Sequence, residues 1–443
     1  MSIEIFEHLN YKKLLHFTMP SIIMLVVSSI YGVVDGYFVS NYVGKVPFAA
    51  INFIIPFLML FSSLGFMFGT GGGALISKTF GEGDMEKAQQ LFSLIVYTTA
   101  ACGFLLMALG QMLIFLFAVT MGAEGELLEY SVIYGRIILM AVPVHILQYE
   151  FQCLAATSGK PALGLYVTLV SGLANIMLDA VFLKGFCWGI RGVAAATVVS
   201  QCIGGIIPLL YFTLPNGSLL RLGKTKFNGK VLLKICFNGS SELMNNISMS
   251  VVSMLYNVQL LRYAGENGIA IYGVLMYVSV VFENVFMGYS VGVAPIIGYY
   301  YGAQNHKELK GLLRKSFVLL TISAAAMFLI SICMSWPLCS VFLGYDESAL
   351  NSAVHAFSLF SFTFLFSGYV IFGSAFFTAL NNGIISMALS AMRTFLFQSI
   401  AVFVLPMFLG VDGIWFSLVV SEMMIAGVTL FMLKLNQKKY QYG

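Results

Sequence analysis

The chain has 443 residues, of which 59% are hydrophobic and only 9% charged, whereas an ordinary soluble domain has roughly 25% charged residues. A water-soluble protein of this length cannot bury so much apolar surface, so much of it must face lipid. Lipid admits only helices or closed barrels, because every backbone polar group needs a partner within the protein. The net charge of +4 is small and scattered, which argues against nucleic acid as a partner.

Long apolar runs without strict alternation indicate spanning helices rather than barrel strands. Polar breaks separate twelve expected spans, near residues 15–39, 47–76, 91–119, 128–152, 162–183, 190–214, 231–262, 268–299, 316–343, 349–373, 384–409 and 412–435. The longest break runs from Pro215 to Lys230. We therefore predict an all-α integral membrane protein of two six-helix bundles: an N-lobe (1–214), a cytoplasmic linker (215–230) and a C-lobe (231–443).

The basic residues indicate how this bundle lies in the membrane. When the N-terminus is placed inside, most of the 23 lysines and arginines fall in inner segments, as the positive-inside rule requires. We expect a multi-pass protein of the cytoplasmic membrane with both termini in the cytoplasm.

The two halves resemble each other at a displacement of about 221 residues. Phe80-Gly81 then aligns with Tyr301-Gly302, and Gly44 aligns with Gly265. Because each half has six spans, both enter the membrane in the same direction. Such parallel repeats are a transporter architecture, with the substrate path at the repeat interface. A duplicated channel or membrane enzyme is also compatible with the repeat.

Six acids qualify as lying at membrane depth, where a charge costs at least a few kcal/mol and indicates function: Asp35, Glu150, Asp179, Glu242, Glu283 and Glu422. Asp35 and Asp179 lie near the outer ends of their spans, together with Asn175, one turn from Asp179, and Thr197. Two neighbouring carboxylates in low dielectric cannot both ionise cheaply, so such a pair can hold a proton. Carboxylate, amide and hydroxyl oxygens can instead coordinate a hard cation such as Na+. We predict a site for the driving ion, although Asn175 and Thr197 taken singly fit helix-to-helix hydrogen bonding.

The other charges at membrane depth have two interpretations. Glu242, Glu283 and Glu422 can bind a cationic substrate, or they can form ion pairs with Arg393, which also lies deep in its span. Glu150 is expected near the cytoplasmic interface, in contact with solvent. Pro20 interrupts the first span, and an interior proline kinks a helix. That kink either responds to ion binding at Asp35 on the same helix or is purely structural.

The order and spacing of several motifs resemble the multidrug and toxic compound extrusion (MATE) family over essentially the whole chain. Pro20, Tyr31, Asp35 and Gly44 resemble that family's first span and following loop. Phe80-Gly81-Glu82-Gly83-Asp84 is similar to its loop after span two. Pro295 and then Tyr301-Gly302-Ala303-Gln304-Asn305 are similar to its span eight and the loop that follows.

The resemblance implies a V-shaped pair of six-helix bundles that exchanges protons or sodium for outgoing amphipathic, usually cationic, compounds. In the DinF-like prokaryotic branch, the first-lobe ion site uses a span-one Asp, a span-five Asn-x-x-x-Asp and a span-six Thr. Asp35, Asn175, Asp179 and Thr197 fit that pattern, and Pro20 lies where the family's bending proline is. Another branch has a second-lobe cation site with acids in spans seven and ten. Because residues 349–373 contain no Asp or Glu, we expect no site of that kind.

Two alternatives remain, one within transporters and one from a different functional class. A lipid-linked oligosaccharide flippase of the same superfamily would need a strongly basic cavity, whereas only Arg393, and less clearly Arg136, is available. An intramembrane enzyme would need a metal or nucleophile constellation, and the five histidines are dispersed. We therefore predict a cation/drug antiporter, not an enzyme, that works by alternating access. It would need no cofactor beyond its coupling ion (H+ or Na+), contact small amphipathic substrates and lipid, and be a monomer.

Overall fold

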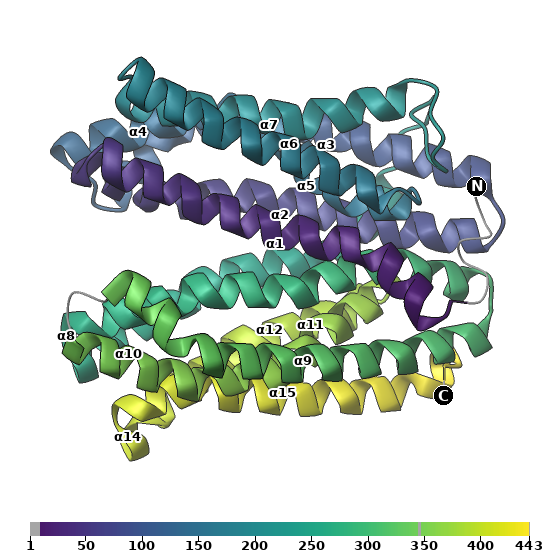
Figure 1. Ribbon diagram of the computed structural model, residues 1–443. Coiled ribbons are helices and arrows are strands. Elements are labelled where there is room, and N and C mark those ends of the chain that lie inside the picture. The colour runs from purple at the N-terminus through teal and green to yellow at the C-terminus, as the bar shows by residue number, and fades with distance from the viewer. Residues whose placement is uncertain (1–8, 344–346, 443) are drawn as a thin grey trace.

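The computed structural model describes residues 9–343 and 347–442, and every regular element in these two ranges is a helix (Figure 1). The expected lobes also include residues 1–8 and 443, which lie outside the described residues. The first half of the chain forms α1 (Tyr11–Tyr42), α2 (Lys45–Gly81), α3 (Met85–Thr120), α4 (Gly125–Leu139), α5 (Val142–Thr157), α6 (Pro161–Ala180), the π-helix η2 (Val181–Gly185) and α7 (Gly189–Thr213).

The second half begins with α8 (Gly229–Gly302), which is two helical arms joined at Gly265, where φ is +65°. It continues with α9 (His306–Leu343), α10 (Glu347–Phe360), the 3-10 helix η3 (Ser361–Thr363), α11 (Phe364–Ala379), α12 (Gly383–Ala391), the π-helix η4 (Met392–Gln398), α13 (Ser399–Val404), α14 (Pro406–Leu409) and α15 (Val411–Tyr440). No strand occurs in the described part of the chain.

These helices account for the twelve expected spans. Ten stretches of the described chain are long and apolar enough to cross a membrane, and the pair α4–α5, bent by 62°, makes an eleventh. The first arm of α8 corresponds to the twelfth. That arm is less apolar because one of its faces carries polar residues, Glu242, Asn245 and Asn246 among them, toward an internal cavity. The all-helical, twelve-span prediction is confirmed.

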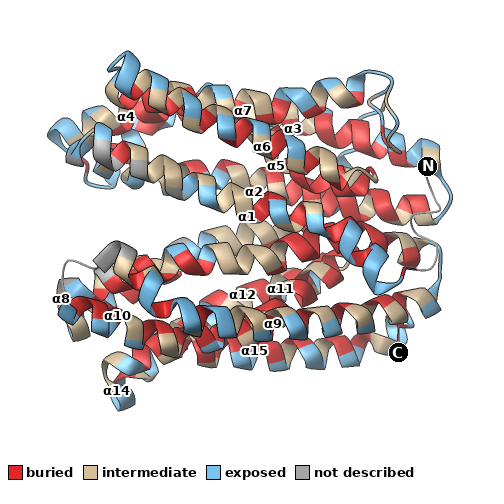
Figure 2. Ribbon diagram, in the orientation of Figure 1, coloured by how far each residue is buried: buried red, intermediate tan, exposed pale blue. Residues whose placement is uncertain are grey.

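Two helical bundles lie side by side (Figure 1). Helices α1–α7 occupy one half of the view and α8–α15 the other, and the bundles lie closest at the end where the termini are found. Exposed residues recur along the helices of both bundles (Figure 2). Many of them are large and apolar, as are Phe104, Leu105 and Met112 of α3. A lipid-facing surface explains this exposure, because hydrocarbon solvates apolar side chains.

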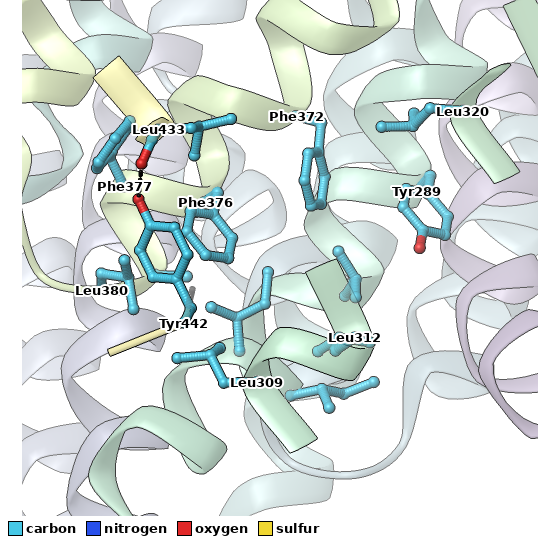
Figure 3. Close-up of a cluster of buried hydrophobic side chains, with 14 of the residues drawn as sticks. Tyr289, Leu309, Leu312, Leu320, Phe372, Phe376, Phe377, Leu380, Leu433 and Tyr442 are labelled. Carbon is cyan, nitrogen blue, oxygen red and sulfur yellow. Dashed lines mark hydrogen bonds between the residues drawn. The ribbon is translucent and has the colours of Figure 1, made fainter. Parts of the chain in front are cut away.

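The largest buried cluster lies at the end of the bundle near the termini. It combines Phe372, Phe376 and Phe377 of α11 with residues of α8, α9 and α15 (Figure 3). The hydroxyl of Tyr442 donates to the carbonyl of Leu433 at 2.6 Å and fixes the chain end in this cluster. The start of α1 also packs here, through Leu14 and Phe17 of its first turns and through Leu9, which precedes the helix. The first helix is thus anchored in the core of the second half.

Small residues bring the two bundles together. A Cβ atom added to Gly292 of α8 would lie 3.1 Å from Cα of Thr18 on α1. One added to Gly71 of α2 would lie 2.8 Å from the backbone nitrogen of Gly239 on α8. Glycine lets helix backbones approach closely where van der Waals packing, rather than hydrophobic burial, drives association in lipid.

The repeated loops fold alike. Gly44 precedes α2 with φ of +107°, and its aligned partner Gly265 joins the two arms of α8 with φ of +65°. Left-handed conformations of this kind favour glycine, which explains why glycine recurs at both turns.

The linker follows α7 and packs back on the first bundle, where the backbone N–H of Leu219 donates to the carbonyl of Ser158 at 3.2 Å. The lobe boundaries at 214 and 231 remain predictions.

Candidate functional site

The predicted ion-site residues come from three packed helices of the first bundle. Asp35 lies on α1, Asn175 and Asp179 on α6, and Thr197 on α7. The carboxyl groups of Asp35 and Asp179 interact directly. Asp179 is 0% exposed and Asn175 is buried, and the π-helix η2 begins two residues after Asp179. The fold therefore brings the two acids together, as their depth along the spans predicted.

A glycine sets the approach of α1 to α6. The ring of Tyr31 occupies the space that a side chain at Gly172 would need, and the Tyr31 hydroxyl donates to the carbonyl of Leu169 at 3.4 Å. Asp35 follows Tyr31 by one helical turn on the same face. The Tyr31–Gly172 contact thus positions Asp35 against the C-terminal half of α6.

Several polar atoms of this site lack a hydrogen-bond partner among the described residues. Oδ1 of Asp35, both carboxylate oxygens of Asp179 and Nδ2 of Asn175 are buried without a hydrogen bond. Buried carboxylates are normally paired or hydrogen-bonded, because an isolated charge in a low-dielectric interior is very unfavourable. A shared proton, or a cation held by these oxygens, would satisfy them. The donor set of carboxylate, amide and hydroxyl groups suits a hard cation.

Tyr134 of α4 completes the site, and sequence reasoning missed it. Its hydroxyl group lies close enough to Asp35 and Asp179 to interact with them electrostatically and is near the hydroxyl of Thr197, while its ring is buried. Thr197 itself donates to the carbonyl of Val193 at 3.0 Å. The chain has 22 tyrosines, and nothing in the sequence around Tyr134 distinguishes it from the others. Only the packing of α4 against α7 reveals it.

Glu150 does not lie where we expected. It is 0% exposed, neither of its oxygens has a well-formed hydrogen bond to a described residue, and the hydroxyl of Thr99 is a neighbouring polar group. It lies on α5 among apolar residues, with Leu147, Phe151 and Leu154 of the same helix in a buried cluster. The prediction of a solvated Glu150 near the cytoplasmic interface was wrong, because position along a helix gives depth and not the face that a side chain occupies.

A cavity of about 460 Å³ lies between the two bundles. Residues of α1, α2 and α5 line one side, and residues of α8, α11, η4 and α15 line the other. Three charged residues of the described chain line it: Glu242, Glu283 and Arg393. Its volume is in the usual range for a site that holds a drug-sized molecule.

Arg393 joins two of the predicted acids. Its Nε donates to Oε1 of Glu422 at 2.6 Å, and its Nη2 lies 3.6 Å from Oε1 of Glu283. Of the two interpretations left open by the sequence, ion pairing describes the geometry of these three residues. Glu242 forms no ion pair with another described residue and faces the cavity.

The second bundle has no counterpart of the Asp35 site. Tyr256 is the residue aligned with Asp35 under the repeat displacement. It is buried, its hydroxyl lies 2.7 Å from the hydroxyl of Ser417, and its ring stacks on Tyr272. An apolar ring with a satisfied hydroxyl cannot replace a carboxylate as an ion ligand. The expectation that the second lobe lacks a cation site of the span-seven and span-ten kind remains a prediction.

Pro20 lies inside α1 at the contact with the second bundle. The residues on either side of it, Thr18 and Ile22, pack against Gly292 and Gly288 of α8. Pro20 has no N–H to donate to the carbonyl of His16, four residues earlier. The weak point of α1 therefore coincides with the surface where the two bundles meet.

Comparison with known proteins identifies the fold and the family. The family model MatE matches two stretches of the chain, residues 20–181 and 243–404. The chain belongs to the MatE (MATE) family. The two matched stretches are equal in length and fall one in each half, as the internal repeat predicts. This family consists of transporters, so the protein is a membrane transporter and not an enzyme.

Relatives and solved structures match the MATE chain along nearly its whole length. The multidrug export protein MepA of Staphylococcus haemolyticus is 26% identical over 424 residues, which cover 95% of this chain and 92% of the relative. MepA of Staphylococcus saprophyticus is 24% identical over 417 residues, 94% and 92% of the two chains. A MATE crystal structure in complex with MaL6 has a TM-score of 0.94 at 20% identity, covering 100% of this chain and 99% of that one.

A MOP superfamily transporter from Pyrococcus furiosus has a TM-score of 0.93 at 20% identity, over 99% of this chain and 98% of that one. At this level of identity, the structural matches establish a common fold and nothing about substrate. The V-shaped arrangement of two bundles expected from the sequence is therefore that of known MATE structures.

Proposed function

We propose that the protein is a secondary active multidrug exporter that exchanges H+ or Na+ for amphipathic cationic compounds by alternating access. The observation that carries this proposal is the contact between Asp35 and Asp179. Three of the four oxygens of these two carboxyl groups are buried without a hydrogen bond to a described residue. Such a pair needs a proton or a metal cation to be stable in a lipid-embedded interior. Binding of a driving ion between these two carboxyl groups is therefore favourable.

The identity of the exported compounds rests on the cavity and on the relatives. The relatives are named multidrug export proteins. The cavity has more acidic than basic side chains, with Glu242 and Glu283 against Arg393, and methionines contribute to its lining. Methionine side chains adapt to ligands of different shape, and uncompensated carboxylates attract organic cations. Both features support export of varied cationic amphiphiles.

The proposed cycle couples the ion site to the bundle interface through α1. An ion from outside binds between Asp35 and Asp179 and changes how α1 packs on α6. Because α1 is weakened at Pro20 and contacts α8 on both sides of that residue, this change alters the interface between the bundles. The cavity then releases its substrate outward, and ion release to the cytoplasm resets the transporter.

The charge of the cavity argues against a flippase for lipid-linked oligosaccharides. A pyrophosphate carries several negative charges and needs a strongly basic site. The one basic side chain among the described cavity residues, Arg393, already pairs with Glu422 and Glu283. The geometry therefore favours cationic over pyrophosphate-bearing substrates.

The test is dye efflux from proteoliposomes that contain the purified transporter. Ethidium movement would be measured under a proton gradient and, separately, under a sodium gradient. Wild type would be compared with Asp35→Asn and Asp179→Asn, and with Asp412→Asn as control, because Asp412 is an exposed acid paired with His355. We expect one gradient to drive efflux in wild type and the control, and neither gradient to do so in the two site variants. Full ion-driven efflux in Asp35→Asn would refute the proposed coupling.

We also propose that the protein lies in the cytoplasmic membrane as a monomer with both chain ends inside. Cys187 is exposed in the loop between η2 and α7, which this orientation places outside. A membrane-impermeant maleimide added to intact cells should label wild type and fail to label Cys187→Ser. Labelling that requires permeabilised cells would reverse the orientation.

A further inference from the structure

Arg393 is held unequally by its two carboxylates. The bond from its Nε to Glu422 is 2.6 Å long, and Glu422 is 0% exposed. The separation between Nη2 and Glu283 is 3.6 Å, and the side chain of Glu283 is 27% exposed. A short charge-assisted hydrogen bond away from solvent is strong, whereas a longer, partly solvated ion pair contributes little. Arg393 is therefore anchored to Glu422 and only loosely attached to Glu283.

The loosely held carboxylate is the one that a ligand can reach. Glu283 and Arg393 both line the cavity between the bundles, whereas Glu422 does not. A cation that enters the cavity can replace Arg393 at Glu283 while Arg393 keeps its bond to Glu422. No buried charge loses its partner in this exchange. Separating Arg393 from Glu422 would leave a buried, unpaired charge and would be strongly unfavourable.

The rest of the cavity wall suits a cation with an apolar body. Met249, Met276 and Met287 contribute thioether groups, and Phe66 and Tyr272 contribute aromatic rings. Aromatic faces attract cations, and methionine side chains adjust to the shape of apolar groups. The wall therefore provides surface for the body of such a ligand and a carboxylate for its charge.

The local backbone around Arg393 is also unusual. Arg393 belongs to the π-helix η4, and Thr394 and Gln398 of the same segment line the cavity with it. Single π-turns within α-helices are rare and are found mostly at functional sites. Arg393 and Thr394 thus both line the cavity from this π-helical segment. The hydroxyl of Thr394 donates to the carbonyl of Ser390 at 3.0 Å.

We propose that Glu283 binds the charge of an organic monocation and that Arg393 is an internal competitor for this carboxylate. Arg393 then sets both the affinity and the charge specificity of the cavity, because each cation must displace its guanidinium from Glu283. This inference rests on the proposed export of cationic compounds, and it adds the carboxylate that binds the cation and the side chain that the cation displaces.

The test measures equilibrium binding to purified transporter in lipid nanodiscs. The probes are tetraphenylphosphonium, a monocation, and Nile red, a neutral apolar dye. The double variant Arg393→Gln with Glu422→Gln removes the competitor without leaving a buried charge. We expect it to bind tetraphenylphosphonium about two- to fivefold more tightly than wild type, the range of a weak ion pair, with Nile red binding unchanged. Adding Glu283→Gln should abolish the gain.

Glu283→Gln alone provides a second readout that does not depend on the folding of the double variant. It should weaken tetraphenylphosphonium binding at least about fivefold and leave Nile red binding unchanged, whereas the surface control Glu347→Gln should match wild type for both probes. Unchanged or weaker cation binding by the folded double variant, or wild-type cation binding by Glu283→Gln, would overturn the inference. Either result leaves the proposed function intact as long as an ion gradient still drives ethidium efflux in wild type.

Discussion

Gly81 and Gly302 each pack against the backbone of the other's helix. A side chain on Gly81 would overlap the carbonyl of Tyr299, and one on Gly302 would overlap the carbonyl of Lys78. The two glycines are aligned by the internal repeat, so the contact is reciprocal. It holds the C-terminal ends of α2 and α8 together and gives a physical reason for glycine in both loop motifs.

Replacing Gly81 by valine should disrupt this contact. The added atoms have no free volume on the α8 side, so the helices must separate or the side chain must strain. We expect the unfolding midpoint of the detergent-solubilised protein to fall, with a loss of about 1–3 kcal/mol. Gly311→Ala on α9 is the control, because nothing lies within 4 Å of its added Cβ and alanine favours helix. Equal midpoints for Gly81→Val and wild type would show that the interface is looser than described.

Removing the hydroxyl of Tyr134 should weaken ion binding without abolishing it. In Tyr134→Phe, Asp35 and Asp179 remain, but a neighbouring polar group is lost, and one hydrogen bond contributes about 1 kcal/mol. We expect the ion concentration for half-maximal efflux to rise about fivefold, with maximal efflux preserved. Tyr130→Phe, one turn earlier on α4, is the matched control. A wild-type ion dependence in Tyr134→Phe would exclude its hydroxyl from the site.

Arg393 and Glu422 should show a large coupling energy in a double-mutant cycle of unfolding free energies. Arg393→Met leaves Glu422 buried without its partner, which is expected to cost about 3–5 kcal/mol. Replacing both by methionine removes both charges, and we expect the double variant to recover most of that loss. Chemical unfolding of the four proteins measures the coupling energy. Additive losses in the double variant would mean that the 2.6 Å bond contributes little to the fold.

Glu150→Gln should be tolerated. The carboxyl group lies among apolar side chains, with the Thr99 hydroxyl nearby but no well-formed hydrogen bond to a described residue, so the ionised form is disfavoured there. A neutral amide of the same shape should leave the unfolding midpoint unchanged or raise it. Glu150→Lys, which introduces a buried charge, should lower it by several degrees. A large loss of stability in the glutamine variant would show that Glu150 is ionised and paired in the folded protein.

The sequence predicted the parts of this fold that depend on periodic patterns. Span lengths, the repeat and the meeting of Asp35 with Asp179 follow from apolar run length, aligned glycines and depth in the membrane. The remainder depends on which face of a helix packs where. Tyr134 could not be singled out, Glu150 was placed in solvent, and the ion pairs of Arg393 were one of two open interpretations. To predict each of these three features, one must know how each helix is rotated about its axis relative to its neighbours. Depth in the membrane and spacing along the sequence do not give that rotation.

The two capping residues of the inner loops show how far the halves have stayed alike. Oδ1 of Asp84 accepts a hydrogen bond from the backbone of Lys87 at 3.0 Å, and Oδ1 of its aligned partner Asn305 accepts one from Glu308 at 3.2 Å. An N-cap works equally well with aspartate or asparagine, so the charge was free to change while the geometry was kept.

Farther into the membrane, the same symmetry has been lost. The carboxylate at Asp35 corresponds to a tyrosine at Tyr256, and Arg393 corresponds to a glycine at Gly172. In the proposed mechanism, the inorganic ion and the organic cation therefore occupy different halves and never compete for one carboxylate. Exchange between them has to be transmitted by the packing of α1 and α2 on α8. Substitutions confined to that packing should uncouple ion flow from drug flow while both ligands still bind.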